Sequence, residues 1–479
     1  MSKPPNKLDV HALREKHPSI TYRSYTLEPR PEGLRIQFTF ELENGPTFTP
    51  HVVLPCAKPF IDGHVKALAF RIGLVELLSY WKSSCPARIL IAADYLPQSE
   101  TSFWHDLLQK GLGEFFFLNK ISPHLPVEIE SLVPTTKNSA TRTAATHRPK
   151  HLAQSYMVLV GGGKDSIVSL ELLKSLEEDN KRLLLAFSIN PIQASLQAIA
   201  RAQYPPPLLG TRTIDPKLLT LNANGYLNGH TPYSALLAFA STLTGYLNSV
   251  EIVLASNESS ASEGNVLFHE VEINHQYSKS VEFEVAFRHL MTTLGIPVAY
   301  CSLLRPLNEL QICKIFSGHH KHFSIFRSCN RSQTIAAKEA ARQAHGEAST
   351  TWCGCCPKCI FTFLCLGCFL DKDVLSGIFG VLPSAHPEFV EIVRGLSGME
   401  AHKPFECVGT YNEVRACLQY IITKKPELFQ SVLKPITELA KLFPETPVLS
   451  DLLSEWDQHN FLPLELKSLV ERALTNEAL

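Results

Sequence analysis

The sequence predicts an α/β protein built on a parallel sheet, with an α+β domain before it and a helical region after it. Residues 156–173, YMVLVGGGKDSIVSLELL, have the pattern of a buried strand, a glycine turn and a helix. From residue 155 to about residue 301, strand-like apolar runs alternate with helical patterns, which is typical of a parallel sheet. After Asp371 the periodicity is helical. The predicted parts are an N-terminal domain at 1–125, a linker at 126–152, the α/β domain at 153–370 and the helical region at 371–479.

The composition is ordinary for a soluble globular protein. Hydrophobic residues make up 45% and charged residues 19% of the 479 residues, which is enough for two or three domains. The net charge of −1 predicts no general attraction to nucleic acid or to an anionic membrane, so we expect neither as a partner. The first residues lack the apolar segment of a secretory signal, and no apolar run is long enough to span a membrane. We therefore expect a cytoplasmic protein with reduced cysteines.

The N-terminal domain shows strand and helix patterns without evident chemistry. Strict alternation over 34–42 predicts a half-buried strand, and Asn44-Gly45-Pro46 turns the chain into a second strand at 47–54. Helical spacing predicts helices at 65–81 and 103–112, with a buried strand at 88–92 between them. The polar, basic stretch that follows, 134–150, has no periodicity and is expected to be a solvated connection.

The glycine turn of the α/β domain has the features of an anion site. Glycines let the backbone approach a phosphate closely, and the N–H groups of the first helical turn favour negative charge. Lys164 would add a cation, Ser166 a hydroxyl donor and Asp165 a ligand for Mg²⁺. The spacing is not that of a Walker A motif. A glycine turn without any ligand is the alternative. The predicted nucleotide-binding residues here are Gly161, Gly162, Gly163, Lys164, Asp165 and Ser166.

Polar residues follow the other predicted strands at 183–189, 251–255 and 298–301. Because ligands bind beyond the carboxyl ends of such strands, we expect Ser188 and Asn190 to flank an adenine or a ribose. Helix capping explains only part of the polar segments 227–232, 255–262 and 272–280. The further candidates are His230, Glu258, His275 and Lys279 as catalytic residues, and Asn228, Asn257, Asn274, Tyr277 and Arg305 as substrate-binding residues.

Clustered cysteines predict a metal site. Cys353, Cys356 and Cys359 form a C-x2-C-x2-C run, and Cys329 lies upstream. Four thiolates would complete a closed, tetrahedral zinc site with a structural role. An iron–sulfur cluster or a redox pair is the alternative, because the same spacing occurs in cluster proteins. Cys355 is then the spare thiol.

Several of these motifs resemble known proteins. The loop Gly161–Ser166 resembles the S-G-G-x-D-S pyrophosphate loop of the ATP pyrophosphatases, which split ATP between its α and β phosphates; the first Ser of that pattern is Gly161 here. The cysteine run resembles that of 7-cyano-7-deazaguanine synthase. Most of the chain resembles the UDP-N-acetyl-α-D-muramoyl-L-alanyl-L-glutamate epimerase family. The matching stretches are 72–82, 161–166, 227–232, 256–262, 274–280, 328–330, 352–359 and 403–409.

The resemblance implies an adenine nucleotide α-hydrolase-like (pyrophosphate-loop) core and an isomerase of peptidoglycan precursor synthesis, part of cell wall biogenesis. It implies ATP- and Mg²⁺-dependent inversion of the terminal L-glutamate of UDP-N-acetylmuramoyl-L-alanyl-L-glutamate, which we expect to pass through an acyl-adenylate with release of AMP and pyrophosphate. Zn²⁺ would be structural. His275 and Lys279 are the first acid–base candidates, and Lys279 or Arg305 would pair with substrate anions. Two alternatives are another adenylating enzyme, acting in tRNA or nucleobase modification, and a nucleotide-binding protein without activity. The sequence leaves the oligomeric state open.

Overall fold

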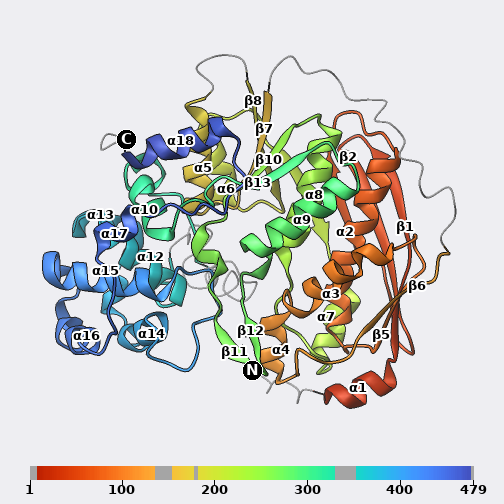
Figure 1. Ribbon diagram of the computed structural model, residues 1–479, viewed down its shortest axis with the longest axis horizontal. Helices are drawn as coiled ribbons and strands as arrows, with labels where there is room; N and C mark the ends of the chain where they lie inside the picture. Colours follow the sequence, from red (N-terminus) through yellow and green to blue (C-terminus); the bar gives the residue numbers. More distant parts are fainter. Residues whose placement is uncertain (1–7, 135–153, 177–181, 330–351, 476–479) are drawn as a thin grey trace.

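One mixed sheet runs through the computed structural model, which describes residues 8–134, 154–176, 182–329 and 352–475 (Figure 1). Within these residues the sheet has 11 strands, and a two-stranded sheet stands apart. The strands are β1 (Ser19–Arg30), β2 (Gly33–Leu42), β3 (Thr47–Phe48), β4 (His51–Pro55), β5 (Arg88–Ile91), β6 (Glu128–Ser131), β7 (Gln154–Leu159), β8 (Arg182–Ile189), β9 (Leu208–Thr213), β10 (Ile252–Ala255), β11 (Val266–Phe268), β12 (Val271–Ile273) and β13 (Ala299–Ser302). The order in the large sheet is β13-β10-β7-β8-β9-β4-β2-β1-β5-β6, with β3 beside β2.

Helices cover both faces of this sheet. They are α1 (Val10–Lys16), α2 (Gly63–Trp81), α3 (Thr101–Gln109), α4 (Gly113–Asn119), α5 (Lys164–Lys174), α6 (Gln193–Arg201), α7 (Pro216–Ala223), α8 (Tyr233–Leu247), α9 (Val281–Thr293), α10 (Glu309–Ser317), α12 (Pro357–Gly367), α13 (Lys372–Phe379), α14 (Phe389–Leu396), α15 (Tyr411–Lys424), α16 (Leu433–Ala440), α17 (Leu449–Leu453) and α18 (Leu464–Thr475). Helices α2, α8 and α9 belong to one hydrophobic core, and α5, α6, α10 and the C-terminal helices belong to the other (Figure 1). Within the described residues, none of the helices has the length and apolarity to cross a membrane.

The parallel part of the sheet carries the two cores on its two faces. Strands β13, β10, β7, β8 and β9 are parallel to one another. Along β7, Tyr156 and Val158 pack into one core, whereas Met157 packs into the other. A strand that is covered on both faces is apolar throughout, which explains the unbroken apolar run in the sequence. The predicted α/β class with a large, mostly parallel sheet is therefore confirmed.

The N-terminal strands extend the same sheet. Residues His51–Val53 of β4 pair in antiparallel fashion with Thr211–Thr213 of β9, a strand that the sequence analysis did not predict. Residues 128–131, which fall inside the predicted linker 126–152, form the strand β6; residues 135–152 of that linker lie outside the described part of the chain. The predicted domain boundaries stay a prediction, and the shared sheet shows that the first two domains pack as neighbours.

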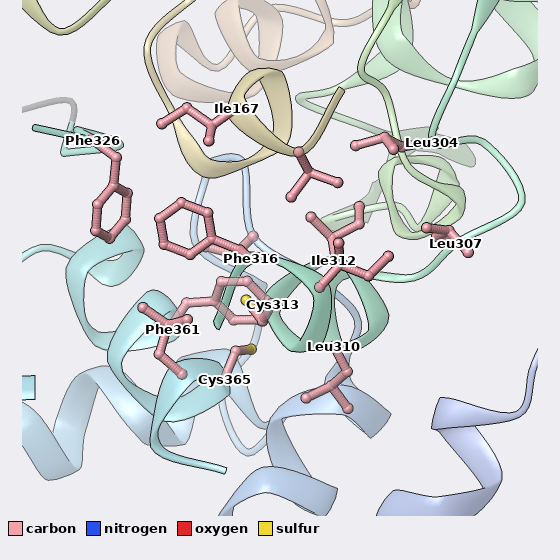
Figure 2. Packing of buried hydrophobic residues seen from close by; sticks show 14 of the residues in the cluster. Ile167, Leu304, Leu307, Leu310, Ile312, Cys313, Phe316, Phe326, Phe361 and Cys365 are labelled. Atoms are coloured by element: carbon pink, nitrogen blue, oxygen red, sulfur yellow. The ribbon is translucent and has the colours of Figure 1, made fainter. Parts of the chain in front are cut away.

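The C-terminal helices pack against α5 and α10. Figure 2 shows Ile167 of α5, Phe316 of α10 and Phe361 of α12 meeting in this core, with Cys313 and Cys365 turned toward each other. The helical C-terminal region is confirmed. Its predicted helix at 427–443 is shorter, because α16 begins only at Leu433. Pro435 lacks an N–H and fits only the first helical turn, so the helix starts just before it.

Candidate functional site

A pocket with a cavity volume of about 290 Å³ opens beyond the carboxyl ends of β7, β8 and β10. This is the edge where parallel sheets bind ligands, and the volume is at the lower end of the range for small-molecule sites. Polar groups on its wall come from the glycine loop, from the strand ends and from three cationic side chains. The residues that line these walls include Gly161, Gly163, Asp165, Ser166, Ser188, Ser256, Asn257, Lys279, Arg327 and Lys358.

The loop Gly161–Ser166 has the geometry of an anion cradle. The Gly162 N–H donates to Ser166 Oγ over 3.2 Å, and Ser166 Oγ donates to the Gly163 carbonyl over 3.0 Å, which closes the loop on itself. Gly162 has a φ of 85°, a left-handed conformation that favours glycine. A Cβ at Gly161 would meet no atom within 4 Å, because this residue faces the open pocket. The start of α5 at Lys164 therefore points its free N–H groups toward that space.

Lys164 does not face the pocket as the sequence suggested. Its side chain is 3% exposed and its ammonium bonds to Asp165 and to Glu309 of α10. Burial would raise the pKa of Asp165, but the charges of Lys164, Lys358 and Lys279 outweigh it and lower that pKa, so the carboxylate stays ionised. Lys164 thus anchors the loop, and the cations that face the pocket come from Lys279, Arg327 and Lys358.

The four predicted cysteine ligands come together beside the loop. The sulfurs of Cys329, Cys353, Cys356 and Cys359 all lie within 4.8 Å of one another. The sulfur–sulfur distances of 3.9 Å for Cys329–Cys356, 3.6 Å for Cys353–Cys359 and 3.3 Å for Cys356–Cys359 are close to the roughly 3.8 Å that tetrahedral Zn–S bonds of about 2.3 Å require. The residues present therefore fit a structural metal ion.

The cysteine cluster also shapes the pocket. The Arg327 N–H donates to the Gly162 carbonyl over 3.0 Å, two residues before Cys329. A Cβ at Gly163 would lie 2.9 Å from Ser328 Oγ, so this segment packs closely on the loop. Lys358 stands between Cys356 and Cys359 in sequence and lines the pocket. A metal ion held by the cysteines would thus fix the position of two cations of the pocket.

A second polar cluster lies next to Lys279. His275 Nδ1 is 2.5 Å from Glu114 Oε2, and the rings of His275 and His230 are 4.5 Å apart. Cys407 is close enough to His275 to shift its pKa, and the Cys407 sulfur is 3.1 Å from Lys279 Nζ. Three predicted catalytic residues, His230, His275 and Lys279, are therefore brought together, although their distances were not predictable from the sequence.

The protonation states in this second cluster follow from its charges. Burial lowers the pKa of His275, but Cys407 and Glu114 accept from it and raise that pKa to about 9. Burial and the nearby positive charge of His275 lower the pKa of His230 to about 3. Burial also opposes the charge of Lys279, yet Cys407 and Glu258 raise its pKa. The positive charges of Lys82 and Lys279 act on His230, so they would also repel a metal cation bound by these two histidines.

Sequence reasoning missed Glu114, Cys407, Arg327 and Lys358. Glu114 stands on α4 and Cys407 in the segment before α15, both far in sequence from the histidines that they contact. Cys407 carries the one available signal: a polar thiol between Pro404 and Val408 in a stretch that is neither strand nor helix. No pattern in the sequence joins these residues, because only the fold brings them together.

The remaining predicted residues divide into two groups. Ser188 and Asn257 line the pocket, and Asn257 Nδ2 donates to Ser302 Oγ over 3.1 Å. Arg305 is fully buried: it forms an ion pair with Glu284 and donates to the carbonyls of Glu258 and Lys279. This geometry favours a positioning role for Arg305 over a direct substrate contact.

Five further predicted residues lie outside the pocket wall. The Asn190 amide bonds to both backbone groups of Arg212 in β9, and exposed Asn228 accepts from the Gly229 N–H. Asn274 and Tyr277 line a separate hollow on the other side of η5 (Tyr277–Lys279). Glu258, 3% exposed, is not part of the pocket wall, and its charge helps to raise the pKa of Lys279. The predicted roles of these residues stay predictions.

Comparisons with known proteins match most of the chain. The family model for the MurL N-terminal domain matches residues 12–303, and that for the MurL C-terminal domain matches residues 325–447. A Micromonospora protein named UDP-N-acetyl-alpha-D-muramoyl-L-alanyl-L-glutamate epimerase is 31% identical over 463 residues, which is 95% of this chain and 98% of the relative. Proteins with the same name from Salinispora tropica and Xanthomonas oryzae pv. oryzae are 36% identical over 371 residues (76% of each chain) and 30% identical over 418 residues (86% of this chain and 87% of the relative). No solved structure matches the chain.

Proposed function

The chain belongs to the MurL family, and from this premise we propose that it is an ATP-dependent epimerase of peptidoglycan precursor synthesis. It converts the terminal L-glutamate of UDP-N-acetyl-α-D-muramoyl-L-alanyl-L-glutamate to D-glutamate. The relatives are named as epimerases of that compound, and epimerases are isomerases. The observation that carries the ATP-dependent part is the pocket at the strand ends, where an open glycine loop faces three cationic side chains.

The pocket has the parts that a nucleoside triphosphate needs. The N–H groups at the start of α5 favour phosphate oxygens, and Ser328 offers a hydroxyl donor nearby. Lys279, Arg327 and Lys358 supply the positive charge. Phe187 and Ile189 give an apolar wall at the end of β8 for the adenine, next to Ser188. This division of the wall into a charged part and an apolar part supports ATP over a purely anionic ligand.

Two metal ions are implied, and the residues present fit both. Asp165 stays ionised and lines the pocket, so it is the side chain that would hold Mg²⁺, which neutralises charge on a departing pyrophosphate. The four thiolates of the cysteine cluster would hold a structural Zn²⁺. A site closed by four sulfurs leaves no coordination position for a substrate. We therefore assign the zinc ion a structural role, which includes the placement of Lys358.

The need for ATP follows from the acidity of the reacting carbon. A Cα–H beside a carboxylate is far too weak an acid to lose its proton near neutral pH. Joining the carboxylate to AMP removes its negative charge and makes that proton much more acidic. The glycine loop and Lys358 would stabilise the departing pyrophosphate, and Lys279 would orient the carboxylate. Hydrolysis of the acyl-adenylate then releases AMP and the D-glutamate product.

A single incubation tests this proposal. The purified protein is given ATP, Mg²⁺ and UDP-N-acetylmuramoyl-L-alanyl-L-glutamate, and AMP, pyrophosphate and the chirality of the glutamate are measured. We expect AMP and pyrophosphate in equal amounts with D-glutamate. The Asp165→Asn variant should lose both products, whereas Lys434→Met, at an exposed lysine of α16, should lose neither.

Three results would contradict the proposal. AMP formation that depends on a tRNA or a nucleobase, with no D-glutamate, would assign the chain to another adenylating activity. Retained ATP binding without turnover of any of these substrates would make it a nucleotide-binding protein. Inversion of the glutamate in the absence of ATP would remove the role of the glycine loop.

A further inference from the structure

We propose that Cys407, as a thiolate held between Lys279 and His275, is the catalytic residue that moves the Cα proton on one face of the glutamate. The inference rests on the proposed function, because it needs a reacting glutamate carbon. It concerns the second polar cluster, which consists of Glu114, His230, His275, Lys279 and Cys407.

The segment that carries Cys407 is fixed from both sides. Asn265 Nδ2 donates to the Pro404 carbonyl over 2.9 Å, and the same Asn265 accepts the His275 N–H over 2.7 Å. Gln276 Nε2 donates to the Val408 carbonyl over 3.4 Å. These hydrogen bonds hold the backbone on either side of Cys407 next to the segment that carries His275. The fold itself therefore brings Cys407 and His275 together.

The surroundings of the thiol stabilise its anion. Lys279 Nζ lies 3.1 Å from its sulfur, and the positive charge of His275 also stabilises the anion. Lys358 adds a positive charge from the first turn of α12. Burial alone would raise the pKa of Cys407, but Lys279 first, then Lys358 and His275, lower it well below the ordinary value. Glu114 in turn holds His275 as an imidazolium, the arrangement in which a third group orients the partner of a reactive thiol.

The other candidates are less suited to accept a proton from carbon. Lys279 is held as an ammonium and His275 as an imidazolium, so at neutral pH neither has a free lone pair. Asp165 is needed at the phosphate end of the pocket, and Glu258 is buried and not part of the pocket wall. Glu114 is occupied by its pairing with His275 and His230. Among the described residues of the cluster, Cys407 and His230 therefore remain as bases, and the thiolate is the one in contact with Lys279.

Lys279 connects this cluster to the nucleotide pocket. Its side chain lines the pocket that holds Asp165 and the glycine loop, and its ammonium contacts the Cys407 sulfur. A carboxylate bound to Lys279 at the edge of the pocket has its Cα one bond away. The half-buried thiol is thus on the side of the pocket where the reacting carbon is expected.

The proton balance of the step is as follows. The Cys407 thiolate takes the proton from Cα, which forms an S–H bond and breaks the C–H bond, and the electron pair moves into the acyl group as an enolate. An acid on the opposite face returns a proton to Cα with inverted configuration. The thiol then loses its proton to solvent, and the opposite acid takes one from solvent, so no oxidant or reductant is consumed.

The decisive experiment separates adenylation from proton transfer. Cys407→Ser and Cys407→Ala are incubated with ATP, Mg²⁺ and the L-glutamate substrate in D₂O. We expect exchange of pyrophosphate into ATP to stay within about threefold of the unsubstituted protein. Deuterium at Cα and D-glutamate should both fall by about 100-fold or more, the usual effect of removing an acid–base group. Cys56→Ser, at a buried thiol outside the cluster, should keep all three signals.

A second measurement does not depend on the activity of a variant. The pH dependence of Cys407 alkylation by iodoacetamide is followed by peptide mass spectrometry in the full-length, zinc-loaded chain. We expect half-maximal alkylation at a pH well below the ordinary thiol value of about 8.5, and a shift toward that value in Lys279→Met and in His275→Gln. Lys434→Met should leave the midpoint unchanged.

Each possible result bears on the inference. Full epimerase activity of Cys407→Ser overturns the role of Cys407 and leaves the proposed function intact. The same holds if a Cys407 variant loses pyrophosphate exchange together with proton exchange. An ordinary alkylation midpoint in the unsubstituted protein overturns it as well, and so does a glutamyl adduct on Cys407. If the unsubstituted protein forms neither AMP nor D-glutamate, the proposed function itself fails.

Discussion

Alanine at Gly162 should damage the loop Gly161–Ser166, whereas alanine at its neighbour Gly161 should not. A Cβ at Gly162 would lie 2.6 Å from the Ser195 nitrogen and 2.9 Å from the Ala194 carbonyl carbon, both backbone atoms of the segment that opens α6. The left-handed φ of 85° adds about 1–2 kcal/mol for a residue with a side chain. Overpacking against backbone adds about 1–3 kcal/mol. Together we expect Gly162→Ala to lower the free energy of unfolding by about 2–5 kcal/mol.

Gly161 is the matched control because it lies in the same loop. A Cβ there meets no atom within 4 Å, and its φ is outside the left-handed range. Gly161→Ala should therefore leave the free energy of unfolding unchanged or raise it by about 0.4–1 kcal/mol, since alanine restricts the unfolded chain.

Urea unfolding followed by circular dichroism measures the two stabilities, and titration calorimetry on the same samples measures ATP binding. A shift of the loop away from Ser195 should weaken ATP binding by about tenfold or more in Gly162→Ala, because misplacement of binding groups is costly. Equal stabilities for the two variants would refute the described loop conformation. A Gly162→Ala protein that is destabilised but binds ATP normally would refute the placement of the phosphates.

Three further predictions address the metal site, the pocket and the pH dependence. Cys356→Ala should destabilise the fold and lower the bound zinc, measured by metal analysis, from about one ion per chain to near zero. The control Cys355→Ser should keep the metal, and equal zinc in both variants would contradict the ligand assignment. Lys358→Met should raise the KM for ATP by roughly tenfold, the effect of losing a charge-assisted hydrogen bond, with little change for Lys434→Met. Burial lowers the pKa of Lys82 from 10.5 to about 8, so the folded protein loses this proton first, and the free energy of unfolding should rise between pH 8 and 10.5; Lys82→Met should flatten that rise in urea titrations at several pH values.

The sequence alone was sufficient for features that depend on neighbouring residues. The strand, glycine turn and helix at 156–173 form because apolar β-branched residues, glycines and helical spacing follow one another directly, and the structure places β7, the loop and α5 there. The cysteine run is similar, because a C-x2-C-x2-C spacing at the start of a helix brings three sulfurs together in any fold. Resemblance over most of the chain then indicated the family, and the comparisons confirmed it.

Tertiary structure decided which side chains face the pocket. Lys164 looked like a phosphate ligand, but it lies on the side of α5 that packs on α10, where Glu309 pairs with it. Periodicity shows that a residue is helical, and it does not show which neighbouring element that residue meets. The cations of the pocket come instead from η5, from the segment before Cys329 and from α12.

The second polar cluster shows the same limit more strongly. Glu114, His230, His275 and Cys407 stand on four segments of the chain, 161 residues apart in the case of Glu114 and His275. Residue type marks each of them as able to carry a proton, and the sequence determined that much. Whether a thiol is a thiolate or a histidine an imidazolium depends on charges within a few ångströms, and only the folded chain determines which charges those are.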